Sequence, residues 1–141
     1  MKGEQDLYAI LRNLWFPFFN QKKRELARSI FSKSQNYFYV ANKGIVNRVF
    51  AYFYKDFGTV KLGAKFDEFF DIIIQGDCVV RIHYPNKLKE RLDKVYKVKN
   101  PFNMQVMNEF SELAFNDYPI KIIITRDKQL AEEMKMMVRK G

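Results

Sequence analysis

The chain has 141 residues, of which 48% are hydrophobic, so it can form one domain with a substantial core. Its formal net charge of +9 favours a polyanionic partner such as RNA, although a lysine-rich surface also serves solubility and thermal stability. Cys78 and His83 are the only cysteine and the only histidine, which excludes a disulfide framework and a Cys/His metal cluster within one chain, and we expect neither a metal nor a cofactor.

The N-terminus reads Met-Lys-Gly-Glu-Gln-Asp and lacks the apolar region and the cleavage site of a signal peptide. No segment reaches the roughly 18 consecutive apolar residues of a membrane span. The sequence therefore predicts a cytoplasmic protein without a membrane contact.

Residues 1–44 are expected to form an N-terminal helical subdomain. Apolar residues at helical spacing predict a helix over 6–19, ended or kinked by Pro17. A second amphipathic helix is predicted over 22–31, and 37–40 suit a short strand before a turn at 42–44. The two helices can also be read as a helix-turn-helix, but the usual short glycine-containing turn is missing.

The next stretch, 45–74, predicts a helix that leads into strands. Apolar residues recur at helical spacing over 45–57, whereas 66–74 is an aromatic and β-branched run typical of a buried strand. Between them, Gly58 and Gly63 flank four residues, enough for a short strand and a tight turn before the next strand.

Gln75-Gly76-Asp77 is a turn signal between the apolar runs 69–74 and 78–84, which predicts an antiparallel hairpin. Farther on, the sequence predicts a helix over 104–116, an interior strand over 120–125 and, from local propensity, a helix over 127–140 that Asp127 caps.

A basic amphipathic helix is predicted over 87–99. Its exposed cations are candidate contacts to RNA phosphates, and the alternative is a merely solvated face. These candidate RNA-binding residues are Lys87, Lys89, Arg91, Lys94 and Lys97.

Two stretches resemble the archaeal tRNA-splicing endonuclease family. Val-Lys-Leu-Gly-Ala-Lys-Phe at 60–66 is similar to the turn of its core motif, and 110–127, which includes Lys121, is similar to its closing helix and strand. The resemblance implies an α+β (mixed α/β) fold with N-terminal helices, then a mixed sheet flanked by helices with a restriction-endonuclease-like core over 45–141.

Members of this family cut RNA without a metal by means of a tyrosine, a histidine and a lysine. The tyrosine position falls on or near Ile73 and the histidine position on Asp77-Cys78, so Lys121, near the family's lysine, stands without its partners, and His83 is interpreted as structural. The resemblance therefore implies a non-catalytic structural subunit, which helps to position precursor tRNA and pairs with a catalytic chain in an α2β2 heterotetramer.

The family has an acidic loop and a final strand where local propensity predicts the C-terminal helix. The loop would insert into a neighbouring subunit and the strand, at 134–139, would pair with a partner strand. The two readings stay open. The implied interface residues are Asp127, Glu132, Glu133, Met134, Met136 and Val138.

Two other classes fit parts of the sequence. A PD-(D/E)xK nuclease has its metal-binding acids near the positions of Asp71 and Asp77, but Arg81-Ile82-His83 replaces the acid-x-lysine, which leaves at most an inactive, DNA-binding form. An α/β ligand-sensing or regulatory domain would explain the strand over 120–126 followed by a helix.

Overall fold

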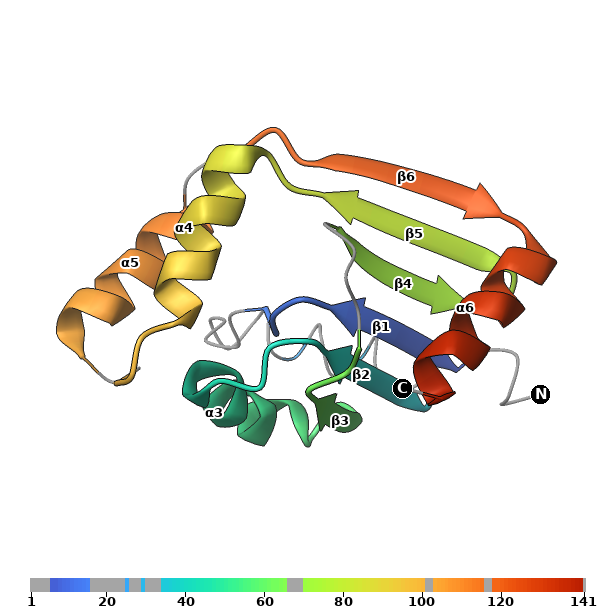
Figure 1. The fold of residues 1–141 in the computed structure, drawn as a ribbon, viewed down its shortest axis with the longest axis horizontal. Helices are drawn as coiled ribbons and strands as arrows, with labels where there is room; N and C mark the ends of the chain where they lie inside the picture. The colour runs from blue at the N-terminus through green and yellow to red at the C-terminus, as the bar shows by residue number, and fades with distance from the viewer. Residues whose placement is uncertain are drawn as a thin grey trace.

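The structure is a computed structural model that describes residues 6–15, 25, 29, 34–65, 70–100, 103–115 and 118–140. Its centre is a six-stranded mixed sheet in the order β3-β2-β1-β4-β5-β6 (Figure 1). The strands β1 (Leu7–Leu11), β2 (Asn36–Val40) and β3 (Thr59–Leu62) are parallel. The strands β4 (Asp71–Gln75), β5 (Cys78–His83) and β6 (Lys121–Arg126) continue the sheet with antiparallel pairings.

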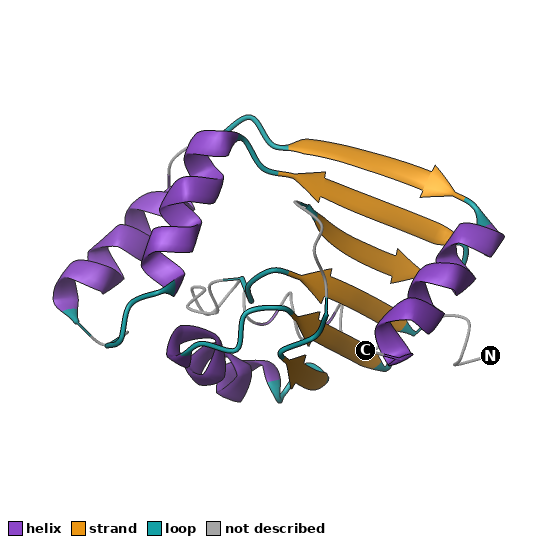
Figure 2. Ribbon diagram, viewed as in Figure 1, coloured by secondary structure: helices purple, strands orange, loops and turns teal. Residues whose placement is uncertain are grey.

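Four helices are described around this sheet. Figure 2 shows α4 (Asn86–Tyr96) and α5 (Met104–Phe115) side by side at one end of the sheet, with α3 (Ile45–Tyr54) near β3. The last helix, α6 (Lys128–Lys140), crosses the opposite end and contacts β4 and β5.

The strand register places Ala9, Leu11, Phe38 and Val40 on one face of the sheet. Buried side chains from α3, α4 and α5 pack against this face, and three of their rings meet: the centroid of Phe50 lies 5.7 Å from that of Tyr96 and 5.3 Å from that of Phe110. Tilted and edge-on rings at such distances add about 0.5–1.5 kcal/mol per pair to the stabilisation from buried area. This cluster holds α4 and α5 on the sheet.

The other face carries a second cluster, in which α6 covers β4 and its neighbours through Ala131 and Val138. The helix starts at a capped position, since the Leu130 N–H donates to Asp127 Oδ1 over 3.0 Å. Lys135 is only 5% exposed, and its ammonium donates to the Gly76 carbonyl over 3.3 Å.

Several predictions about individual elements are confirmed. The hairpin β4–β5 turns at Gly76, whose φ of 61° lies in the left-handed region that suits glycine. The predicted strands near 37–40 and 59–62 and the helices at 45–57, 87–99, 104–116 and 127–140 are present, with ends that differ by a few residues. The fold is mixed α/β, as predicted.

The helix predicted over 6–19 is wrong in its first part, because Leu7–Leu11 form the central strand β1. A strand that is covered on both faces is apolar throughout, and such a short run also satisfies helical spacing. The helix predicted over 22–31 lies almost wholly outside the described residues. The predicted parts 1–44 and 45–141 both supply strands to one sheet.

Three expectations for later strands are also wrong. β3 pairs with β2 and not with the following strand, so no tight turn joins β3 to β4. β6 is an edge strand, with Ile122 and Ile124 59% and 66% exposed, although the isoleucines of 120–125 predicted an interior strand. The strand that the resemblance implied at 134–139 is part of helix α6, where apolar residues at helical spacing face the sheet.

Candidate functional site

The parallel strands β1, β2 and β3 end at one edge of the sheet, which we call the carboxyl edge. Strand direction changes at β1, which is parallel to β2 and antiparallel to β4. In open α/β sheets, ligands bind in the crevice outside the carboxyl ends of the parallel strands. Residues 12–15, directly after β1, lie at such a place.

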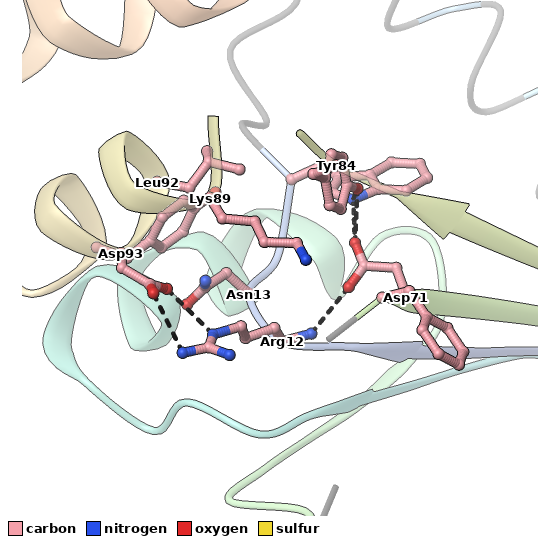
Figure 3. A pocket seen from close by; sticks show the side chains of 10 residues that line it. Arg12, Asn13, Asp71, Tyr84, Lys89, Leu92 and Asp93 are labelled. Carbon is pink, nitrogen blue, oxygen red and sulfur yellow. Dashed lines mark hydrogen bonds and ion pairs between the residues drawn. The ribbon is translucent and has the colours of Figure 1, made fainter. Parts of the chain in front are cut away.

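An edge cavity of about 50 Å³ opens here, between the end of β1, the start of β4, the end of β5 and α4 (Figure 3). Its wall combines a buried acid, two cations and several rings. The lining residues are Arg12, Asn13, Trp15, Phe70, Asp71, Tyr84, Lys89, Leu92, Asp93 and Tyr96.

Asp71 is the buried acid, with 3% of its surface exposed. Its Oδ2 accepts hydrogen bonds from the Tyr84 hydroxyl over 2.6 Å and from Trp15 Nε1 over 3.1 Å, and its Oδ1 accepts one from the Arg12 backbone N–H over 3.1 Å. Burial raises the pKa of the Asp71 carboxyl, and the hydrogen bonds oppose this shift. Asp71 thereby links the start of β4 to the segment that follows β1 and to the residue that follows β5.

Tyrosines fix the chain that leaves β1. Tyr54 donates to the Trp15 carbonyl over 2.9 Å and Tyr96 donates to the Leu14 carbonyl. Burial raises the pKa of both phenols, and that of Tyr84, so all three remain protonated donors at neutral pH. The backbone beside the edge cavity is therefore held in one conformation.

The mouth of the edge cavity carries both signs of charge. The Arg12 guanidinium pairs with the Asp93 carboxylate, with Nε 3.0 Å from Oδ1, and so ties the end of β1 to α4. Figure 3 shows Lys89 reaching from α4 over the cavity, between this ion pair and the Asp71–Tyr84 side. The polar wall is thus close to neutral while offering cationic donors.

An apolar cavity of about 160 Å³ adjoins the edge cavity, and Trp15, Tyr84, Leu92 and Tyr96 line both. The remaining wall of the apolar cavity comes from Leu88, Phe110 and Leu113. Trp15 is 39% exposed, so its ring stands between these cavities and solvent.

A third, open cavity of about 430 Å³, the basic cavity, lies where α3 begins and α4 ends. Arg48, Lys97 and Lys99 line it, and all three are exposed. The first turn of α3 contains no acidic residue and its N-cap, Gly44, makes no side-chain capping bond. Helix N–H groups without such caps give this end a positive potential.

The basic cavity and the edge cavity are neighbours, because Tyr96 lines both. An asparagine cluster joins their walls: Asn13 Oδ1 accepts hydrogen bonds from Asn42 Nδ2 and Asn47 Nδ2, each over 2.9 Å. Asn47 is fully buried and its Oδ1 accepts the Leu14 N–H over 2.7 Å. One rigid scaffold therefore carries both cavities.

The predicted RNA-binding residues of α4 and its C-cap, Lys97, lie in different surroundings. Arg91 is engaged within the protein, where its guanidinium pairs with Glu109 over 2.7 Å and Glu112 over 3.1 Å. Lys89 lines the edge cavity and Lys97 the basic cavity. Lys87 and Lys94 are exposed.

The positions implied for catalysis do not converge. Ile73 is half-buried on the face of β4 that Ala9 shares, and Cys78 lies at the start of β5. Lys121 starts β6 on the opposite face, paired in register with His83. The His83 ring packs on Phe70, with centroids 4.5 Å apart, and within the described residues its buried Nε2 has no hydrogen-bond partner.

The acids of the nuclease alternative are also separated, since Asp71 begins β4 and Asp77 lies in the turn after it. Five strand residues place them roughly 15–20 Å apart. Among the described residues, no group of three or more His, Cys, Asp or Glu side chains could hold a metal ion.

The implied interface residues belong to α6 and its cap. Val138 is 4% exposed and Met134 packs against the same core cluster, so neither is available to a partner strand. Asp127 caps the helix and Glu132 pairs with Lys135 over 3.4 Å. Glu133 and Met136 remain exposed.

No family model matches the chain, and neither the curated proteins nor the solved structures contain a significant match. In the part of the chain that the structure describes, no helix is both long and apolar enough to cross a membrane.

Sequence reasoning missed several residues at the carboxyl edge, among them Arg12, Trp15, Arg48 and Lys99. Trp15 carried a usable signal, because it is the only tryptophan of the chain and comes shortly after the apolar run 7–11. Arg12, Arg48 and Lys99 gave no such signal, because they become neighbours of the cavities only through the packing of β1, α3 and α4.

Proposed function

We propose that this chain binds RNA through the phosphate backbone at the carboxyl edge, without catalysing its cleavage. The observation that carries the proposal is the basic cavity, where Arg48, Lys97 and Lys99 surround the start of α3. Cations and free helix N–H groups are the donors that phosphate oxygens accept most readily.

The distribution of charge supports this location. Arg12, Arg91 and Arg126 each pair with acids of the chain itself. Within the described residues, no ion pair involves the three cations of the basic cavity. The net charge of +9 would add long-range attraction for a polyanion.

In its specific form, the proposal is that the chain is the structural subunit of a heteromeric tRNA-splicing endonuclease. This form rests on the resemblance at 60–66 and 110–127, and it includes the restriction-endonuclease-like core and the α2β2 assembly. It predicts that precursor tRNA is cleaved only after a catalytic chain is added, with EDTA present. EDTA-resistant cleavage by this chain alone would refute it.

A regulatory domain for a whole small ligand fits less well. The edge and apolar cavities hold about 50 and 160 Å³, whereas sites for drug-sized ligands hold roughly 300–1,000 Å³. The larger basic cavity is open and lined by cations, which suits a phosphate backbone better than an apolar ligand.

The test is the salt dependence of RNA binding, measured by fluorescence anisotropy. The triple variant Arg48→Ala, Lys97→Ala, Lys99→Ala should lower the slope of log K against log salt by about two units, because each phosphate contact on single-stranded RNA contributes about 0.7. The matched control replaces three exposed lysines elsewhere, namely Lys55, Lys61 and Lys128.

An unchanged slope in the first variant, or an equal loss in the control, would show that the basic cavity makes no phosphate contacts. Tighter binding of duplex DNA than of RNA would favour the DNA-binding alternative.

A further inference from the structure

Two cavities beside the basic cavity have no role in phosphate binding. The edge cavity and the apolar cavity share Trp15 and Tyr84. Rings and leucines form the whole wall of the apolar cavity and about half of the wall of the edge cavity. A phosphate would not enter the apolar cavity, because the charged group would lose its hydration there. These cavities require a different occupant from the one that suits the basic cavity.

The geometry limits the size and shape of that occupant. Volumes of about 50 and 160 Å³ suit one planar ring system and not a whole cofactor. The Trp15 ring is fixed at its polar edge, because Nε1 donates to Asp71 Oδ2 over 3.1 Å and to the Tyr84 hydroxyl over 3.0 Å. A fixed and partly exposed indole offers a face on which another ring can stack.

The cations of the neighbouring basic cavity indicate which kind of molecule would carry this ring. Tyr96 lines the edge, apolar and basic cavities alike, so a backbone bound at Arg48 and Lys97 would lie next to the two cavities that Trp15 lines. Proteins that bind single-stranded nucleic acid combine a cationic groove with aromatic rings on which bases stack. In a duplex the bases are already stacked on each other and are not available.

We propose that the hollow formed by the edge and apolar cavities receives one unstacked base of a single-stranded RNA segment, which stacks on Trp15 while the basic cavity holds the flanking phosphates. This inference rests on the proposed function, since it needs RNA bound at the carboxyl edge. It adds a preference for single strands or loops over duplex RNA.

The wild-type protein allows a direct test, because Trp15 is the only tryptophan and its fluorescence reports on this one position. A single-stranded oligoribonucleotide should quench the emission as it binds. Two other probes, a blunt RNA duplex and an abasic oligonucleotide of the same length, should bind by anisotropy without quenching.

The possible outcomes distinguish the base site at Trp15 from the phosphate site at the basic cavity. Binding without any quenching by the single strand, or equal quenching by all three probes, would overturn the base site and leave the phosphate site standing. If none of the three RNAs binds, the proposed function fails and the base site fails with it.

A variant provides the second measurement. Trp15→Ala should weaken single-strand binding by roughly 5- to 150-fold, which corresponds to the 1–3 kcal/mol of one stacked base, and should leave duplex binding unchanged. The control is Tyr52→Ala, which removes a 71% exposed ring of α3 that lines none of the three cavities. Equal losses for both RNAs, in a Trp15→Ala protein with native circular dichroism, would contradict the base site.

Discussion

Asp71 joins three segments at the cost of burying a carboxylate. It accepts hydrogen bonds from the Arg12 backbone, the Trp15 indole and the Tyr84 hydroxyl. Trp15 lies 56 residues from it in the sequence, so no local pattern could predict that bond, whereas Tyr84 lies 13 residues away across the predicted hairpin. The sequence singled out Asp71 only as an acid of a possible metal site.

The raised pKa of Asp71 has a consequence for stability. Above the ordinary value of 3.8, the unfolded chain has lost this proton while the folded protein still holds it. The contribution of Asp71 is therefore complete at low pH and is lost as pH rises through the folded-state pKa. We expect the free energy of unfolding of the wild type, minus that of Asp71→Asn, to decrease as pH rises through this range.

Urea unfolding of both proteins over a pH series gives this difference, in which the effects of all other titrating groups largely cancel. A difference that stays constant with pH, or that grows as pH rises, would show that burial does not dominate the environment of Asp71.

At the scale of elements, helices and strands were predicted best where a turn or capping residue accompanied the spacing of the apolar residues. The β4–β5 hairpin and α6 both had such signals, at Gly76 and Asp127. β1 and β6 had only apolar runs, which do not distinguish a helix from a strand or an interior strand from an edge strand. Their identities depend on their neighbours, β2, β4 and β5.

Because β6 lies at the edge of the sheet, we expect a substitution in β6 to cost less stability than the same substitution in the interior strand β4. Ile124→Ala, at a side chain 66% exposed, should change the free energy of unfolding by less than about 0.5 kcal/mol. Ile72→Ala on β4, at a side chain 1% exposed, should cost about 2–5 kcal/mol because it leaves a cavity. Denaturant unfolding measures the change in the free energy of unfolding for both variants. Equal changes would mean that the side chain of Ile124 is covered by another part of the protein.

At the scale of the whole molecule, structural and candidate functional groups gather at opposite ends of the sheet. α6 crosses one end of the sheet (Figure 1) and is held there by capped and paired side chains. The residues at the carboxyl edge, at the other end, line the three cavities. Net charge alone predicted a polyanionic partner, but the place where it would bind required the packing of α3 and α4 on the sheet.

Amide hydrogen exchange with and without single-stranded RNA locates the contact most directly. RNA bound at the carboxyl edge should slow exchange in the first turn of α3, over 45–48, and at the end of α4, over 96–99, while leaving α6 unchanged. Slower exchange confined to β6 and α6, with none at the start of α3, would contradict RNA binding at the carboxyl edge.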